Sequence, residues 1–335
     1  MEYDYKYKAF TRSITFNHAP YIGDTMDGFT MQETTFPFVC AIIDDASTDG
    51  EQDVIGKYLA ENFQTPYRTE ETDDYRLICA NHKTNRNCSF VVFLLKYNHY
   101  NIKKDKLLYL AEWWQNAQYH ALCEGDDYWT DPLKLQKQAD FLDKKHEFGM
   151  VYADCNTYIQ STNTLAPIGD YSGKTSASEL LLDNSIATLT VMMRTSVYNH
   201  YYEEIDNAVR NTWKMGDYPI WIWFSIRSKI GYINETVATY RILDSSASHN
   251  KDLRKQLAFA INAKEISLYF AKRYGYTDLL PRIEQEINKY CALRSLLDLD
   301  FRSFIPYYYH SSKISFNNLL GYLKAGVKMK FFHKN

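Results

Sequence analysis

The chain has 335 residues, a length that suggests two structural units or one large α/β unit with an appendage. Hydrophobic residues make up 45% and charged residues 24%, values that exclude a disordered or fibrous protein. The net charge of −3 is uneven, because residues 301–335 carry six basic residues and no acid, so that residues 1–300 carry −9. A body this acidic argues against general nucleic-acid binding.

The ends and the cysteines of the sequence indicate a cytoplasmic location. The sequence starts with acidic residues and no apolar h-region, so we expect no secretory signal. No uncharged apolar run approaches the roughly 20 residues that a spanning helix needs. The six cysteines lie far apart without a C-x-x-C pair, which favours buried or free thiols in a reducing compartment.

Short apolar runs alternate with helical patterns through the first 155 residues. Uninterrupted apolar runs at 38–43, 119–123 and 150–153 are typical of strands covered on both faces, and each run ends in acidic residues. Apolar residues have helical spacing at 22–29, before the first of these runs, and at 135–142, between the last two. The alternation predicts an α/β fold with a doubly wound, mostly parallel sheet flanked by helices. Ligands of such sheets bind at the carboxyl ends of the strands.

Beyond residue 175 the pattern becomes helical, whereas residues 68–95 give no clear pattern. Helices are predicted over 178–184, 218–229 and within 252–299. We place a boundary near residue 250, which divides the chain into a catalytic domain at 1–250 and a helical C-terminal extension at 251–335.

The acidic loop DDASTDG follows the strand at 38–43 and precedes a helix. Its start resembles an EF-hand, but Gly56 stands where that calcium loop needs a glutamate, and the flanks are a strand and a helix. Capping of the following helix explains Ser47 or Asp49. It leaves the paired acids Asp44 and Asp45 unexplained, so the loop is a candidate for binding.

The segment EGDDYWTDP, after the strand at 119–123, carries a denser group of acids. Adjacent carboxylates repel one another unless a cation or donor compensates them, and Mg²⁺ or Mn²⁺ is typically held by one or two carboxylates plus substrate phosphates. Asp126 and Asp127 are the candidate ligands. The alternative is a solvated acidic turn, in which Asp131 caps the next helix.

Three segments in this order resemble glycosyltransferase family 2: Ile14-Thr-Phe-Asn17, the loop 44–50, and Cys123–Trp129. The resemblance covers roughly residues 8–65 and 96–250, although the proline that usually precedes the threonine is absent. It implies a GT-A fold, a nucleotide-diphosphate sugar donor, a divalent metal (Mg²⁺ or Mn²⁺) and inversion at the anomeric carbon.

The resemblance also implies roles for individual residues. Asp45 would accept a hydrogen bond from the base, Asp126 would contact the ribose region, and Asp217 would be the general base that deprotonates the acceptor hydroxyl. For Asp217 the alternative is a helix N-cap, and for His249 it is an ordinary surface histidine. The implied donor-binding residues are Thr15, Asn17, Asp45, Asp126 and Arg241, and the implied metal ligands are Asp127 and His249.

The expected function is transfer of a sugar from a nucleotide-diphosphate donor, with a UDP-sugar favoured, to a hydroxyl of a glycan or lipid-linked acceptor in polysaccharide biosynthesis. Two alternatives stay open. One is a catalytically degenerate nucleotide-sugar-binding or scaffold protein, and the other is a metal-dependent phosphohydrolase or nucleotidyltransferase. The intact acids Asp45, Asp127 and Asp217 weigh against the first, and their spacing weighs against the second.

The C-terminal tail has apolar residues at helical spacing, flanked by lysines. A basic amphipathic helix of this kind is typical of peripheral membrane association, here through residues 316–332 at the inner face of the membrane. The alternative is that the stripe packs on the helical domain of the protein itself. The apolar residues are Phe316, Leu319, Leu320, Leu323, Val327 and Phe331.

Overall fold

The computed structural model describes residues 5–167, 173–243 and 252–332, and it divides into two compact units. The first unit comprises Met1–Thr175, Ser185–Glu203 and Ser228–Arg241. The second comprises Ser176–Asn184, Glu204–Arg227 and Ile242–Asn335. Two segments that precede residue 250 thus belong with the C-terminal helices, and the assignment of 1–250 as the catalytic domain stays a prediction.

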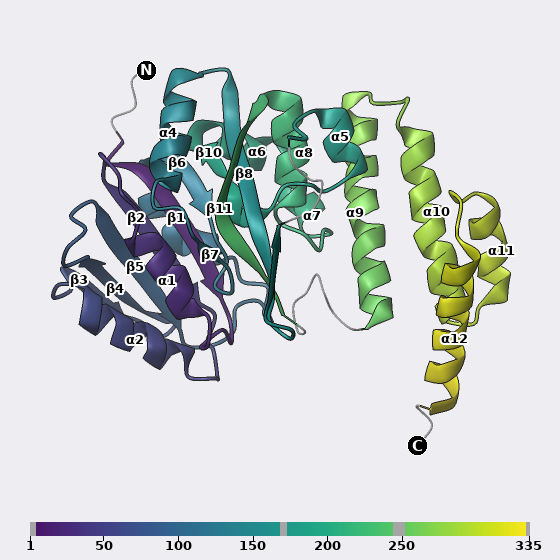
Figure 1. Cartoon of the computed structure of the whole chain (residues 1–335), viewed down its shortest axis with the longest axis horizontal. Helices are drawn as coiled ribbons and strands as arrows, with labels where there is room; N and C mark the ends of the chain where they lie inside the picture. The colour runs from purple at the N-terminus through teal and green to yellow at the C-terminus, as the bar shows by residue number, and fades with distance from the viewer. Residues whose placement is uncertain (1–4, 168–172, 244–251, 333–335) are drawn as a thin grey trace. The chain divides into compact units, whose positions relative to one another are not determined.

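The first unit is built on one twisted sheet with a parallel centre (Figure 1). Four parallel strands stand in the order β5–β2–β1–β6. Antiparallel strands extend this centre on both sides, which confirms the predicted α/β class with a parallel sheet flanked by helices. The strands are β1 (Tyr7–Thr15), β2 (Phe38–Asp44), β3 (Arg68–Glu71), β4 (Tyr75–Asn81), β5 (Cys88–Leu95), β6 (Ala117–Leu122), β7 (Tyr128–Trp129), β8 (Phe148–Ile159), β9 (Thr164–Pro167), β10 (Met192–Arg194) and β11 (Lys229–Ile242).

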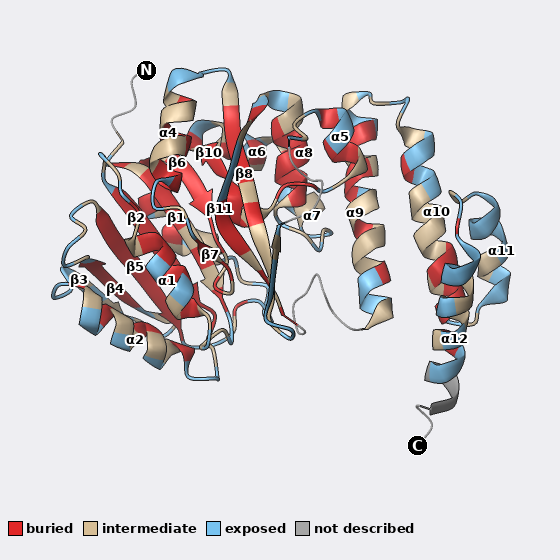
Figure 2. Ribbon diagram, viewed as in Figure 1, coloured by how far each residue is buried: buried red, intermediate tan, exposed pale blue. Residues whose placement is uncertain are grey.

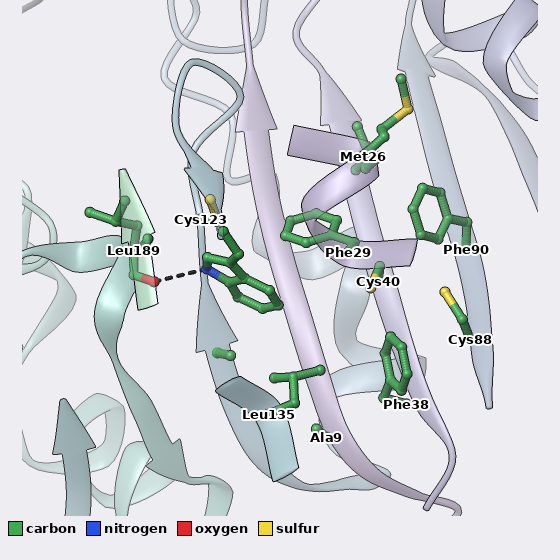
Figure 3. Packing of buried hydrophobic residues seen from close by; sticks show 14 of the residues in the cluster. Ala9, Met26, Phe29, Phe38, Cys40, Cys88, Phe90, Cys123, Leu135 and Leu189 are labelled. Carbon is green, nitrogen blue, oxygen red and sulfur yellow. Dashed lines mark hydrogen bonds between the residues drawn. The ribbon is translucent and has the colours of Figure 1, made fainter. Parts of the chain in front are cut away.

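Helices cover both faces of the parallel centre, so β2 and β5 are buried along their whole length and β1 and β6 over most of theirs (Figure 2). Along β2, Cys40 and Ile42 join the core under α1 (Ile22–Thr30), α2 (Glu51–Asn62) and α4 (Lys134–Lys144), whereas Val39 and Ala41 join the core under η1 (Leu107–Leu110) and α3 (Ala111–Trp114). Helix α6 (Thr195–Glu204) follows β10. Figure 3 shows the first core, where Phe29 of α1 packs edge-on against Phe90 of β5. Apolar residues on both faces explain the uninterrupted apolar runs in the sequence.

The second unit is helical. Helix α8 (Tyr218–Arg227) packs on α5 (Ala177–Leu182) and α9 (Leu253–Tyr274), and α10 (Leu280–Leu297) packs on α9, α11 (Phe301–Tyr309) and α12 (Phe316–Phe332). The short α7 (Asn207–Arg210) precedes α8. The predicted stretch 252–299 is two helices, because Gly275 ends α9 with a φ of +79°, a left-handed conformation that glycine adopts without strain.

Helix α12 packs on its own unit through a face that includes Leu319 of the predicted apolar stripe, whereas Phe316 and Val327 of the stripe are 71% and 42% exposed. Leu319, Tyr322 and Ala325 contact the cluster around Leu293, and Gly326 lies so close to α10 that a Cβ would stand 2.5 Å from the carbonyl oxygen of Leu297. For Leu319 this packing agrees with the alternative stated above for the tail, and membrane contact through 316–332 stays a proposal. Across the described residues, no helix combines the length and apolar character that a bilayer crossing requires.

Candidate functional site

Glu51 joins the loops that follow β1 and β2. Its fully buried carboxylate, at the first position of α2, accepts hydrogen bonds from the Thr15 hydroxyl, the backbone N–H of His18 (2.8 Å) and the Ser47 hydroxyl (2.8 Å). Burial raises the pKa of Glu51 above its ordinary value. Thr15, predicted to bind the donor, therefore contributes its side chain to this connection between the two loops.

Asn17 strengthens the same connection. Its backbone adopts a φ of +57°, its N–H donates to the Ser47 hydroxyl (2.9 Å), and its side-chain oxygen accepts from the backbone N–H of Thr48 (2.8 Å). The Thr15–Asn17 segment and the acidic loop thus form one structure at the carboxyl edge of the sheet, where the parallel register pairs Thr15 with Asp44.

Asp45 anchors the segment that follows β5. Its carboxylate is 2% exposed and accepts from the backbone N–H groups of His99 (2.7 Å) and Tyr100 (3.1 Å) and from the Lys106 ammonium (2.5 Å). Both oxygens of Asp45 are thus engaged within the protein. The side chain predicted to meet the nucleotide base holds the 97–106 segment against the acidic loop, and its contact with a base stays a proposal.

The acidic segment at 124–132 packs on the end of β1 through Gly125. A Cβ at this position would lie 2.1 Å from the Thr15 hydroxyl oxygen and 2.4 Å from its Cβ, so only glycine fits here. Thr25 of α1 donates its hydroxyl to the backbone oxygen of Asp127 at 2.7 Å. The carboxylates of this segment are therefore positioned by contacts with both β1 and α1.

Asp127 is a buried carboxylate beside other acids. It is 3% exposed, and its Oδ1 accepts the backbone N–H of Arg241 at 2.7 Å. Burial, and next the charge of Asp126, raise the pKa of Asp127 well above its ordinary value. Asp126 itself lies 4.0 Å from the Nε2 atom of His18. A cation bound here would relieve this repulsion.

The oxygen donors of Asp126 and Asp127 suit a hard cation such as Mg²⁺ or Mn²⁺, which takes its remaining ligands from water and substrate phosphates. In the part of the chain that the structure describes, no three His, Cys, Asp or Glu side chains are grouped to hold a metal by themselves. His249, predicted as a further ligand, lies in the 244–251 segment, outside the described residues. The residues present therefore fit a metal shared with a phosphate ligand.

Arg241 places a buried guanidinium beside these acids. It is 4% exposed, donates from Nη2 to Asp24 of α1 at 2.6 Å, and lies over the rings of Tyr21 (4.6 Å) and Tyr128 (5.0 Å). Its Nε and Nη1 atoms are buried and have no hydrogen-bond partner among residues 5–167, 173–243 and 252–332. Buried donors without partners are costly, and a bound anion would satisfy them.

Three side chains behind the acidic segment hold the backbone of residues 189–191. The Trp129 indole N–H donates to the carbonyl of Leu189 at 2.9 Å, as the dashed line in Figure 3 shows. Gln138 donates to the carbonyl of Thr190 (2.6 Å) and Lys134 to that of Val191 (3.4 Å). Lys134 is fully buried, 4.1 Å from the centre of the Trp129 ring. We call these three side chains the carbonyl clamp.

Burial lowers the pKa of Lys134 to about 7, against 10.5 for an ordinary lysine. Between pH 7 and 10.5 the unfolded chain binds a proton that the folded chain has lost, so the free energy of unfolding should rise with pH, by about 1 kcal/mol per unit. Over the same range, Lys134→Met should lack this increase. Urea unfolding at pH 7.5 and 9.5 measures the difference, with Lys144→Met, at an exposed lysine of the same helix, as the control. Parallel pH profiles for wild type and Lys134→Met would contradict the prediction.

Asp217, the predicted general base, belongs to the second unit and begins α8. Its backbone oxygen accepts from Ile220 N–H (2.9 Å), and its Oδ1 accepts from Tyr218 N–H (2.7 Å). The Tyr218 hydroxyl donates to the carbonyl of Leu180 at 2.6 Å, which fixes the first turn. Asp217 therefore has the helix-terminal position that the alternative interpretation required, and its catalytic role stays a proposal.

No family model matches the chain. Two mycobacterial proteins, uncharacterized protein Rv1520 of Mycobacterium tuberculosis and uncharacterized protein Mb1547 of Mycobacterium bovis, are each 30% identical over 231 residues. The match covers 68% of this chain but 57% of each relative, so the chain spans little more than half the length of these curated relatives.

The chain has a glycosyltransferase fold. The mannosyltransferase PcManGT from Pyrobaculum calidifontis, solved with GDP-mannose and Mn²⁺, matches with a TM-score of 0.52 and 10% identity, covering 99% of this chain and 89% of that one. TarS of S. aureus, residues 1–349 solved in complex with UDP, has a TM-score of 0.45 and 15% identity, covering 90% of this chain and 89% of that one.

Proposed function

We propose that the protein is a metal-dependent, inverting glycosyltransferase of family 2, with a GT-A fold, that uses a nucleotide-diphosphate sugar. One observation carries the proposal. The half-buried Asp126 and the buried Asp127 adjoin a buried Arg241 that has two unsatisfied donors, so a site for a cation lies beside a site for an anion. A divalent metal bound to a diphosphate supplies both charges at once.

In this proposal Asp127 would hold the metal, with His249 as a further ligand, Asp126 would contact the ribose region of the donor, and Arg241 would pair with the diphosphate. When bound, the metal would neutralise the negative charge that develops on the departing diphosphate. Asp217 takes the proton of the acceptor hydroxyl. At the same time the hydroxyl oxygen forms the new bond to the anomeric carbon, and the bond from that carbon to the diphosphate breaks. Attack from the side opposite the leaving group inverts that carbon.

The loops after β1 and β2 would receive the nucleoside, through Thr15, Asn17 and Asp45. That a protein of the same fold binds GDP-mannose and Mn²⁺ supports this class of donor and cofactor. A UDP-sugar remains the favoured donor, and the proposed acceptor is a glycan or a lipid-linked glycan of polysaccharide biosynthesis at the inner face of the membrane.

A donor screen tests the proposal. The purified chain is incubated with UDP-, GDP- and dTDP-sugars, with and without glycan acceptors, in Mn²⁺, Mg²⁺ or EDTA, and nucleotide diphosphate is measured. We expect release with one donor class, stimulated by metal and acceptor. Binding without release would support a degenerate binding protein. Release of inorganic phosphate or nucleoside monophosphate would support a phosphohydrolase or nucleotidyltransferase instead.

We expect Arg241→Lys to raise the KM for the donor about tenfold, because lysine keeps the charge but loses the planar fork of donors that a diphosphate accepts. The hydrogen bond from residue 241 to Asp127 comes from the backbone and persists. Initial rates against donor concentration measure the effect. Arg68→Lys, at an exposed pair with Glu112, is the matched control. An unchanged KM for the donor in Arg241→Lys would show that Arg241 does not bind the diphosphate.

A further inference from the structure

The apolar face of α11, in the second unit, is exposed. None of the nine residues of this helix is buried, although five of them are aromatic and one is isoleucine. Phe301, Ile305 and Tyr309 are spaced four residues apart, so they lie on one face, and they are 53%, 68% and 83% exposed. Figure 2 shows most of the helix as exposed. Apolar surface gathered in this way marks an interaction site more often than chance.

The helix is nevertheless held in place. Asp300 caps it, accepting from the backbone N–H of Ser303 at 3.1 Å. Phe304, at the edge of the apolar face, stacks on Tyr308 with ring centres 5.2 Å apart and packs against the cluster that contains Leu293. One edge of the apolar face therefore packs on the core of the unit, and the rest of the face is exposed on a folded helix.

The charge around this face is positive. Residues 301–335 contain six basic residues and no acid, and Arg302 in α11 and Lys313, four residues after its end, are exposed. The acids of α10 and of its C-cap are already paired. Asp298 accepts from Arg254 and Arg294 (2.7 Å each), Glu286 is bound to Lys289 and Ser312, and Glu284 lies 3.7 Å from Lys272. The remaining acid, Asp300, is engaged as the cap. The positive charge of the segment is thus available to a partner.

We infer that α11 docks on an anionic lipid surface. Phe301, Ile305 and Tyr309 would enter the boundary between headgroups and acyl chains, while Arg302 and Lys313 stay at the level of the lipid phosphates. A second copy of the chain fits less well, because two identical basic faces repel each other. The surface is formed by α11 and is distinct from the apolar stripe of α12, and the inference does not depend on transferase activity.

The test is co-sedimentation of the full chain, without donor, with vesicles of phosphatidylcholine alone or containing about 30% phosphatidylglycerol. The double variant Phe301→Ser, Ile305→Ser removes the exposed apolar side chains. Leu108→Ser, Leu165→Ser is the matched control, because both leucines are exposed in the first unit. We expect partition onto anionic vesicles to fall at least tenfold in the α11 variant and to stay unchanged in the control. Arg302→Gln and Lys313→Gln should each weaken it about fivefold.

Partition of wild type onto anionic vesicles that weakens with salt and is absent from neutral vesicles would support the inference. It is overturned if the wild-type chain does not bind anionic vesicles at low salt, if it binds neutral vesicles equally, or if the α11 variant binds like wild type. A wild-type dimer in sedimentation velocity that the α11 variant abolishes would assign the face to a second copy instead.

Discussion

Asp127→Asn should abolish metal-stimulated donor turnover, reducing it by about 10³-fold, while leaving the protein without metal as stable as wild type or more stable. Asparagine retains an acceptor for the Arg241 N–H and the volume of the side chain. It removes a buried charge that Asp126 repels. Release of nucleotide diphosphate against Mn²⁺ concentration measures the first effect, and thermal unfolding in EDTA measures the second.

Asp131→Asn is the control for this experiment, because Asp131 is an acid of the same segment that accepts from Leu133 N–H at the start of α4. It should leave metal dependence intact. Metal-stimulated turnover of Asp127→Asn at the wild-type level would exclude Asp127 as a ligand. A large loss of stability without metal would show that the carboxylate is needed for folding.

Asp217→Asn should lower the transfer rate at saturating donor by about 10²-fold or more and leave donor affinity nearly unchanged. Asparagine begins a helix as well as aspartate does, so α8 should persist, but its amide does not accept the proton of the acceptor. Single-turnover transfer and equilibrium donor binding separate the two quantities.

Asp206→Asn is the matched control, since Asp206 caps α7 in the same unit by accepting from Ala208 N–H at 2.7 Å. It should have wild-type activity. If donor affinity collapses in Asp217→Asn while the saturated rate survives, Asp217 contributes to binding or structure and another group is the base.

Strands β2 and β6 of the parallel centre could be predicted because their apolar runs are uninterrupted, a pattern that needs no knowledge of the neighbouring strands. Strand β5 belongs to the same centre but lies within 68–95, where no pattern was assigned. Residues 68–95 could not be placed in the same way. β3 reads Arg-Thr-Glu-Glu and alternates between half-buried and exposed side chains, so its pairing with β4 depends on tertiary contacts. The two helices α9 and α10 were predicted as one stretch because helical spacing continues on both sides of Gly275.

The acids at the strand ends could be predicted from the sequence, because adjacent carboxylates directly after an apolar run are easily recognised. The sequence did not reveal the roles of Glu51, Lys134 and Lys106, because a charged residue in or near a helix is normally interpreted as part of its solvent-exposed face. Only the fold shows that Glu51 and Lys134 are fully buried and that Lys106 is paired with Asp45.

The carbonyl clamp has a consequence for motion. Trp129, Lys134 and Gln138 bind three successive carbonyls, so we expect residues 189–191 to move together with the chain from Trp129 into α4. Asp127 lies two residues before Trp129, so a displacement of its carboxylate should reach the backbone that leads into β10. In hydrogen exchange, the amides of both segments should slow together when a ligand binds, as a single cooperative element does.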